Sequence, residues 1–497
     1  MKKTKNIHIL IIVIGIIFIS ISSLHQTIWF DESYSVSIAK HSFTEIWKIT
    51  GNDVHPALYY WLLHIIYMIF GNNIIAFRLF SVLGIAVLGI LGFTHIRKDF
   101  GEKTGILFSF LTFFLPIMCT YATEIRMYSW SAVFVTLMAI YAYRFYKDVK
   151  ENEKFNKKNL CFFGIFSICS CYIHYYALVT AGLINLLLLI FVIKEVKKTS
   201  KPLKAFLMVA LVQIVLYTPW LIYLITQMQH VGGGFWIKVG LVNTTVEVLS
   251  FQFRRMLDDS FSFNIATVIP LIISIIVYLY IGIKIYKDIK EKKNIKPAIY
   301  AIAIYLGVIA IILIISIVMP ILYSRYLLVI TGIYIFAISY ILATENNKVL
   351  IYSICIVIAL MSIWGNIENI KTNYDSSNMQ AINYIKDQIE DDDIIIYSNF
   401  ANGGVIAAYF PEYKQYYLNL EKWDIEEAYK AYAPGMQIVR DYDFLNEFSG
   451  KIWVIDTDSK DVCKKLEQYD IKILKEIKRF NAKYHNYTYN IMLIEKK

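Results

Sequence analysis

The chain has 497 residues, of which 57% are hydrophobic and only 18% are charged. Its Ile, Leu, Phe and Tyr residues run in blocks of about 20, the length of a membrane-spanning helix, which indicates a multi-pass membrane protein and excludes an ordinary soluble one. The net charge of +10 does not point to nucleic acid as a partner, because the lysines lie in short connections where anionic lipid and the rules of membrane insertion account for them.

The first apolar block, residues 7–24, follows Lys2, Lys3 and Lys5. It is long, and no small-residue cleavage site follows it, so we predict an uncleaved first span rather than a signal peptide. Ten further blocks have close to the length needed to cross the hydrocarbon, and the chain is therefore expected to span the membrane eleven times. These blocks are residues 74–95, 104–121, 127–146, 160–173, 177–193, 204–226, 263–284, 298–318, 326–343 and 348–366.

Another apolar stretch, residues 56–70, is short for a span. If it does not cross, the lysine-rich and arginine-rich connections all fall on the same side as the basic N-terminus, as the positive-inside rule requires. We therefore predict an amphipathic or re-entrant helix in the outer interface, which its Tyr59, Tyr60 and Trp61 favour. The resulting topology in the cytoplasmic membrane has a cytoplasmic N-terminus and an extracytoplasmic C-terminus.

The character of the chain changes near Lys371, where the long apolar blocks end. Short apolar runs at 393–397 and 451–456 predict buried strands, and residues 379–389 and 460–469 predict helices. The expected fold class is therefore an α-helical polytopic membrane protein with a small C-terminal extracytoplasmic α/β domain. We place the transmembrane domain at residues 1–368, with an outer loop 25–73 that carries interfacial helices, and the α/β domain at residues 369–497.

Four polar motifs fall on the predicted outer face. Asp31 and Glu32 come just after the first span. Two adjacent carboxylates at a membrane surface are costly unless they are used, although acidic residues at a helix exit often simply face water. The other motifs are His55-Pro56-Ala57-Leu58-Tyr59-Tyr60, Tyr121-Ala122-Thr123-Glu124-Ile125-Arg126-Met127-Tyr128 and Ser324-Arg325-Tyr326.

In this order the motifs resemble those of the GT-C class of membrane glycosyltransferases. The nearest pattern is that of the bacterial family that includes the aminoarabinose transferases of lipid A and is similar to protein O-mannosyltransferases. The resemblance covers residues 1–345 and implies that a sugar is moved from a polyprenyl-phosphate donor to a lipid, glycan or protein acceptor outside the cytoplasmic membrane. Ala57 and Ile125 stand where the family pattern has a second proline and a small residue, which leaves the subfamily, and hence the sugar, open.

The chemistry of this reaction asks for the same residue types. An acceptor hydroxyl loses its proton as it attacks, and a carboxylate within hydrogen-bond reach is a suitable base, so we assign that role to Asp31. A single in-line displacement with one base would invert the anomeric centre. Glu32 is expected to orient Asp31, a substrate hydroxyl or a metal; the alternative is a solvated loop residue.

The leaving group becomes a dianionic phosphomonoester, so cations are expected at the outer leaflet. Arg126 and Arg325 each lie at an outer span end, and a planar guanidinium binds phosphate oxygens with two prongs. The alternative for both is that they only reach for lipid headgroups. Glu124 would hold Arg126 or bind the donor sugar, unless it forms a mere ion pair at the interface.

The remaining candidate substrate-binding residues are His55, Tyr59, Tyr128 and Tyr326. His55 would donate to phosphate or bind a divalent metal together with Asp31, although a histidine beside proline also commonly bonds to a helix start. No cofactor is firmly indicated, and the sequence leaves open whether a divalent metal takes part.

Three other features receive a plainer interpretation. His174 lies among Tyr172, Tyr175 and Tyr176, and we assign it to an interfacial aromatic belt. The segment 232–236, Gly-Gly-Gly-Phe-Trp, would suit either a mobile flap or a flexible turn. The six cysteines show no metal-ligand spacing.

Two competing functions belong to other classes. A lipid or polysaccharide transporter would have ionisable residues in the middle of its spans and repeat symmetry, whereas here the charges concentrate at span ends and no repeat is found. The second is an inactive scaffold that presents its outer domain. This hypothesis does not explain why the acidic pair and both arginines lie on the predicted outer face. The glycosyltransferase is therefore the favoured hypothesis.

Overall fold

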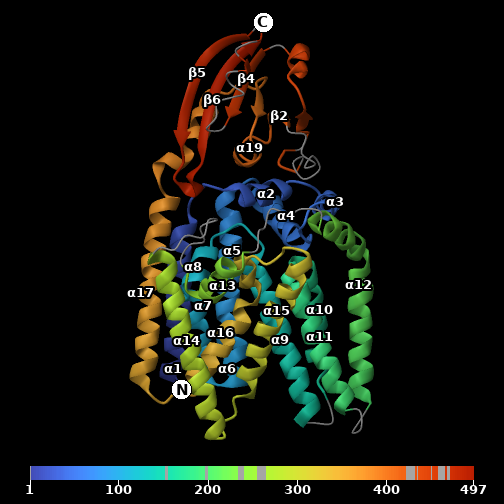
Figure 1. Cartoon of the computed structure of the whole chain (residues 1–497), viewed down its shortest axis with the longest axis vertical. Helices are drawn as coiled ribbons and strands as arrows, with labels where there is room; N and C mark the ends of the chain where they lie inside the picture. The colour runs from blue at the N-terminus through green and yellow to red at the C-terminus, as the bar shows by residue number, and fades with distance from the viewer. Residues whose placement is uncertain are drawn as a thin grey trace. The chain divides into compact units, whose positions relative to one another are not determined.

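The computed structural model describes residues 2–151, 155–195, 200–232, 240–254, 265–420, 431–433, 435–448, 450–456, 465–466, 469 and 471–496. The chain divides into two compact units, whose elements are labelled in Figure 1. The first, here the helical unit, comprises Met1–Ser23, Val54–Tyr59 and Leu79–Ile367. The second, here the mixed unit, comprises Leu24–Asp53, Tyr60–Arg78 and Glu368–Lys497, so it joins the loop after the first span to the C-terminal domain.

The helical unit consists of long apolar helices, because a helix satisfies every backbone N–H and C=O within its own segment where no water is available. Its helices are α1 (Lys2–Ser20), α5 (Ile74–Leu91), α6 (Arg97–Phe100), α7 (Glu102–Phe114), α8 (Pro116–Tyr121), α9 (Tyr128–Glu151), α10 (Lys157–Ile173), α11 (Tyr175–Glu195), α12 (Lys201–Gly232), α13 (Leu241–Ser250), α14 (Ile265–Lys290), α15 (Lys296–Val318), α16 (Leu328–Ala343) and α17 (Lys348–Asn373). The expected polytopic helical fold is thus confirmed.

The count of eleven spans is not confirmed. Among the described residues, eight helices are long and apolar enough to cross a membrane, namely α1, α5, α11, α12, α14, α15, α16 and α17, some of them with flanking residues. The other three predicted spans coincide with α7 and α8, with α9 and with α10. The helix at 104–121 is interrupted because Leu115, which precedes Pro116, is extended at φ −72° and ψ 128°. The stretch 56–70 contains the short helix α4 (Leu58–Phe70), as predicted.

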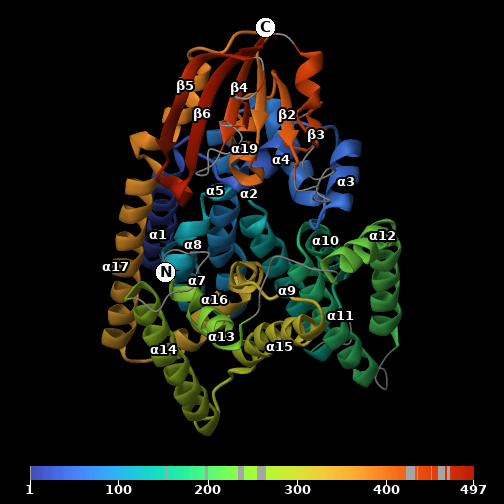
Figure 2. The same cartoon turned by 45° about the horizontal axis from the view of Figure 1, so that its top comes forward.

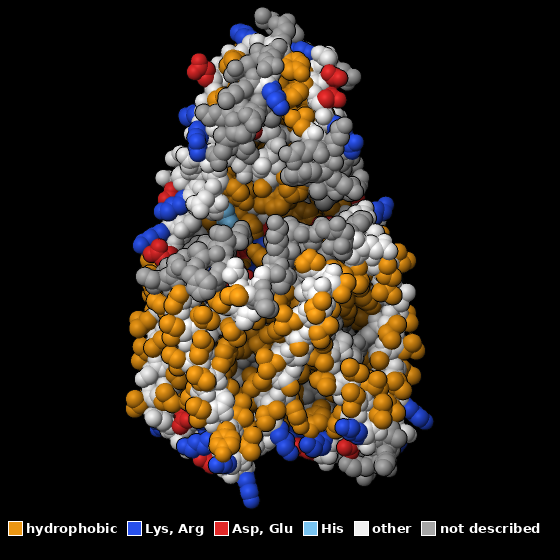
Figure 3. Space-filling model, viewed as in Figure 1, with side chains coloured by type: hydrophobic (Ala, Val, Ile, Leu, Met, Phe, Trp, Pro, Cys, Tyr) orange, Lys and Arg blue, Asp and Glu red, His pale blue; other side chains and the backbone are white. Residues whose placement is uncertain are grey.

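α16 lies at the centre of the helical unit and packs against α7, α9 and α15. Gly332 allows the close approach to α9, since a Cβ at this position would meet Thr136 Oγ1 at 1.9 Å. Large apolar side chains of α12, α14 and α15 are exposed, and hydrophobic side chains cover the visible face of these helices in Figure 3. Such a surface is expected of helices that face lipid.

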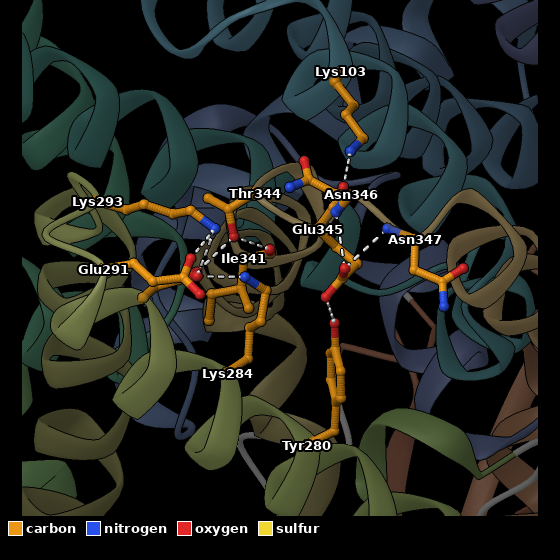
Figure 4. A network of polar contacts seen from close by, with 11 residues as sticks. Lys103, Tyr280, Lys284, Glu291, Lys293, Ile341, Thr344, Glu345, Asn346 and Asn347 are labelled. Atoms are coloured by element: carbon orange, nitrogen blue, oxygen red, sulfur yellow. Dashed lines mark hydrogen bonds and ion pairs between the residues drawn. The ribbon is translucent and has the colours of Figure 1, made fainter.

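Lys and Arg side chains gather at one end of this hydrophobic surface (Figure 3), where a polar network joins the helix ends (Figure 4). The fully buried Asp288 of α14 accepts hydrogen bonds from Lys284, from Lys293 Nζ at 3.2 Å and from Thr344 Oγ1 at 2.7 Å. Glu345 accepts a bond from Tyr280 at 3.2 Å. The network joins the ends of α14 and α16.

The mixed unit contains a six-stranded sheet with the strand order β3-β2-β1-β4-β6-β5. Figure 2 shows these strands side by side. The strands are β1 (Ile394–Tyr397), β2 (Lys414–Leu418), β3 (Gln437–Val439), β4 (Gly450–Asp456), β5 (Ile471–Asn481) and β6 (Thr488–Lys496). The first four are parallel, with Ile394 opposite Ile452, and β6 runs antiparallel to both β4 and β5. Buried aliphatic side chains of β1, β4 and β6 form its core.

The predicted strands at 393–397 and 451–456 correspond to β1 and β4, and the helix predicted at 379–389 corresponds to α18 (Gln380–Lys386). Most of the helix predicted at 460–469 lies outside the described residues. Helix α19 (Phe400–Ala407) connects β1 to β2. From the loop after the first span, the mixed unit adds α2 (Phe30–Ile38), α3 (Phe43–Asn52) and most of α4.

Candidate active site

Asp31 and Glu32 occupy the first turn of α2 in the mixed unit. Trp29 is the N-cap with an extended backbone, and the Glu32 carboxylate reaches back to the Trp29 N–H at 3.3 Å. Acidic residues are favoured in a first turn, because the N-terminal end of a helix carries a partial positive charge. The two carboxylates differ in exposure: Asp31 is partly exposed, whereas Glu32 is fully buried.

Glu32 forms a two-pronged ion pair with Arg78, which lies in the first part of α5, the part that belongs to the mixed unit. Its Oε1 lies 2.5 Å from Arg78 Nη1, and its Oε2 accepts from Arg78 Nη2 at 2.8 Å. Arg78 is also fully buried and donates to the carbonyl of Thr27. The hydroxyl of Tyr484 donates to Glu32 Oε2 at 3.3 Å. The burial excludes the alternative of Glu32 as a solvated loop residue.

Replacing Glu32 by Ala should destabilise the protein strongly, because Arg78 would be left buried without its counter-ion. Breaking a buried ion pair on one side costs about 3–5 kcal/mol. The exposed Glu45 is a matched control: it forms the same kind of capping box with Ser42 at the start of α3, and its loss should cost much less because it leaves no buried charge behind. Thermal unfolding of both alanine variants measures the difference. Equal decreases in melting temperature would show that the buried Glu32–Arg78 pair stabilises the fold no more than the exposed capping box of Glu45.

In the helical unit, the second and third motifs meet. Arg126 lies between α8 and α9, is 3% exposed, and its Nη2 is 2.9 Å from His55 Nε2. Its backbone N–H donates to the carbonyl of Glu124 at 2.7 Å, and the Glu124 side chain is also buried. Tyr59 lies in the first turn of α4, fully buried, with its ring 6.4 Å from that of Phe80.

The fourth motif joins the same cluster. Arg325 belongs to the 3-10 turn η4 (Ser324–Leu327) before α16, is buried, and lies 4.6 Å from the centre of the Tyr323 ring. Both Arg126 and Arg325 are close enough to Tyr128 to act electrostatically on its hydroxyl. The Tyr326 ring lies 6.3 Å from that of Tyr128. Segments that are far apart in the sequence thus bring two guanidinium groups within electrostatic range of one buried tyrosine.

His174, which we assigned to an aromatic belt, is buried within this cluster. Its ring meets that of Tyr326 edge to face at 5.0 Å, and its Nδ1 accepts the N–H of Tyr176 at 3.0 Å. Burial, followed by the charges of His55 and Arg126, lowers the pKa of His174 to about 3. The imidazole is therefore neutral at physiological pH, with its proton on Nε2.

Another buried histidine, His25, lies in the mixed unit. His25 is 5% exposed, its ring packs edge to face between Tyr374 and Tyr484, and neither ring nitrogen has a hydrogen-bond partner among the described residues. Burial and then the charge of Arg78 lower its pKa to about 2. Two buried histidines are therefore neutral, His174 in the helical unit and His25 in the mixed unit.

These two histidines predict a loss of stability in acid. Their folded-state pKa values lie below the ordinary value near 6.5, so below that pH the unfolded chain binds protons that the folded chain does not. The free energy of unfolding should therefore fall from pH 7 to pH 5, by about 2 kcal/mol per histidine. Melting temperatures against pH measure this effect; His25→Phe and His174→Phe should flatten the slope, and an unchanged slope in both variants would refute the assignment.

A cavity of about 220 Å³ opens beside the arginine cluster. His55, His174 and Tyr326 line one part of it, and the remainder is mostly aliphatic. The aliphatic lining comes from Leu178 and Val179 of α11, Leu224 and Met228 of α12, and Ile312, Ile315 and Met319 of α15 or its C-terminal end. The cavity thus combines a polar part with an apolar part built by membrane helices.

Two further predictions concern the glycine-rich segment 232–236 and a possible metal site. Residues 233–236 of the glycine-rich segment lie outside the described residues. Within the part of the chain that the structure describes, no group of three or more His, Cys, Asp or Glu side chains could hold a metal ion.

The fold of this protein is similar to that of two known structures. Over 98% of this chain and 97% of theirs, two solved structures of ArnT from Cupriavidus metallidurans superpose at 10% sequence identity. The apo structure gives a TM-score of 0.52, and the structure bound to undecaprenyl phosphate gives 0.51. The protein thus has the fold of these two ArnT structures, and the resemblance expected from the motifs is confirmed.

Residues 54–223 match the family model of dolichyl-phosphate-mannose-protein mannosyltransferases. The matched segment contains the His55 motif, the Glu124–Tyr128 corner and His174. A search of curated protein sequences finds no match. Together, the fold and the family match indicate a multi-pass membrane glycosyltransferase.

Proposed function

We propose that this protein transfers a sugar, with inversion, from a polyprenyl-phosphate donor to an envelope acceptor on the outer face of the cytoplasmic membrane. The observation that carries the proposal is the arginine cluster, in which Arg126 and Arg325 are both buried within electrostatic range of Tyr128 and Arg126 Nη2 lies 2.9 Å from His55 Nε2. Buried guanidinium groups suit a phosphate that gains charge as it leaves. The fold is shared with ArnT, one structure of which contains undecaprenyl phosphate.

Asp31 acts as the base in this proposal. The acceptor oxygen attacks the anomeric carbon, its proton passes to the Asp31 carboxylate, and the bond between the sugar and the phosphate oxygen breaks with its electron pair on the phosphate. Asp31 is the partly exposed member of the acidic pair, whereas Glu32 is fully buried. Glu32, buried against Arg78, holds the first turn of α2 and does not act on the acceptor.

The other candidate residues bind the donor. His55 and Arg126 contact the phosphate, Glu124 positions Arg126 or binds the sugar, and Tyr59, Tyr128 and Tyr326 shape the polar end of the site. The cavity beside them takes the first isoprene units of the lipid, because its aliphatic walls come from α11, α12 and α15. A divalent metal is not required by this assignment of roles.

The proposal requires a defined topology. We expect the N-terminus in the cytoplasm and the domain at 369–497 outside, because the basic connections lie at one end of the helical unit. Reporter proteins fused after Lys497 and within the basic 284–296 connection measure the two sides. The expected result is extracytoplasmic activity for the first fusion and cytoplasmic activity for the second; the reverse pattern would place the acidic loop on the wrong side.

The sugar and the acceptor can be identified together in a deletion strain. Mass spectrometry of lipid-linked sugars and envelope glycans should show one modification lost and one polyprenyl-phosphate sugar accumulated. Complementation by the wild-type gene should restore both, whereas the Asp31→Asn gene should restore neither. An unchanged envelope and an unchanged donor pool would contradict the proposed function.

A further inference from the structure

The chain between the first span and α2 is irregular, so its backbone groups need partners outside regular structure. Tyrosine hydroxyls of the C-terminal domain supply several of them. The N–H of Leu24 donates to Tyr374 at 3.0 Å, and that of Ile28 donates to Tyr409 at 3.1 Å. The Tyr409 hydroxyl in turn donates to the Gln26 carbonyl at 2.8 Å.

The same pattern continues into α2 itself. The N–H of Phe30, the first residue of the helix, donates to the Tyr487 hydroxyl at 3.1 Å. The Tyr484 hydroxyl donates to the carboxylate of Glu32 at 3.3 Å. Asp31 lies between these two bonded residues. The backbone position of the proposed base is therefore set from both sides by tyrosines of the turn between β5 and β6.

Aromatic packing strengthens this attachment. The Trp29 and His485 rings stack at 4.4 Å with 3° between their planes, and Phe30 packs on Phe400 at 4.8 Å. His485 adopts a left-handed backbone conformation with φ 55°. Such a conformation is costly for a residue other than glycine and persists only where the surroundings enforce it.

We propose that the C-terminal domain is a positioning part of the active site, which holds the Asp31 carboxylate in place through Tyr484, Tyr487 and the stacked His485. The inference rests on the proposed role of Asp31. It gives the C-terminal domain a positioning role in catalysis. Without the hydroxyls of Tyr484 and Tyr487, the first turn of α2 would lose hydrogen bonds on both sides of Asp31. A base displaced by about 1 Å can cost about a hundredfold in rate.

The test uses full-length protein with Tyr484→Phe, Tyr487→Phe and both together, each of which removes a hydroxyl and keeps the ring. Tyr469→Phe is the matched control, since Tyr469 is 40% exposed in the same domain. Hydrogen–deuterium exchange of peptides covering 24–38 reports the attachment, and steady-state kinetics reports the position of the base. We expect faster exchange and at least a tenfold loss of kcat in the double variant, with the KM for the lipid-linked donor unchanged.

Either of two results would overturn the inference: exchange in 24–38 that equals the Tyr469→Phe control, or faster exchange with unchanged kcat. If the double variant melts early, the two single variants decide by the same readouts. The exchange measurement needs no turnover. Absence of transfer by the wild-type protein would therefore refute the proposed function, while exchange would still report whether the domain holds the acidic turn.

Discussion

Asp31→Asn is expected to abolish sugar transfer while the protein still inserts and folds. The substitution keeps the size and shape of the side chain and removes only its ability to take a proton. Loss of a positioned base typically costs about a hundredfold to ten-thousandfold in rate. The variant keeps the buried Glu32–Arg78 ion pair intact, so stability should change little. Turnover of a lipid-linked donor by purified protein measures the effect.

The control is Asp391→Asn, the same chemical change at an exposed turn of the same unit. This variant should match the wild type in both turnover and melting temperature. Glu32→Gln separates the two carboxylates: it should lower the melting temperature and reduce transfer less than Asp31→Asn. Turnover near the wild-type value in the Asp31 variant would refute its assignment as the base.

Arg126→Ala and Arg325→Ala are expected to weaken the use of the lipid-linked donor far more than that of the acceptor. Both guanidinium groups are buried and act on Tyr128, so each variant would remove one cation from the proposed phosphate site. A lost charge-assisted hydrogen bond to phosphate costs about 1.5–3 kcal/mol, which is a factor of about 10 to 150 in kcat/KM for the donor. Donor saturation kinetics, with acceptor varied in parallel, measures this loss.

Arg325→Lys should restore only part of the activity, because lysine keeps the charge and loses the two-pronged geometry. Arg144→Ala is a matched control in the same unit: Arg144 binds Asp99 at 2.7 Å near the basic end of α9, away from the proposed phosphate site in the chain's topology. If an alanine variant at Arg126 or Arg325 changed the KM for the acceptor alone, contact with lipid headgroups would become the better explanation of that arginine.

Much of the fold could be predicted because it follows from local patterns. Apolar blocks of membrane length predict helices wherever they occur, and the basic connections select the short helix α4 over a further span. The number of spans could not be fixed in the same way. Pro116 interrupts one block, and α9 contains polar and aromatic residues that packing against α16 tolerates.

The candidate site was only partly predictable. The motifs supplied Asp31, Arg126 and Arg325, because each lies in a recognisable local pattern. The sequence did not predict the ion pair between Glu32 and Arg78, since the two residues are distant in sequence and only the fold brings them together. A lone arginine within an apolar block was the available signal, because such a charge needs a partner. His174 was missed for a similar reason: its burial against Tyr326 depends on a contact between distant segments.

The central claim is that the protein releases polyprenyl phosphate as it transfers a sugar. The most direct measurement incubates the purified full-length protein with polyprenyl-phosphate sugars and envelope acceptors extracted from bacterial membranes, and follows both by mass spectrometry. We predict that the wild-type protein produces polyprenyl phosphate together with an acceptor that is heavier by one sugar, and that Asp31→Asn produces neither. Equal release by the wild type and the Asp31 variant, or no release from any donor pool, would contradict the account.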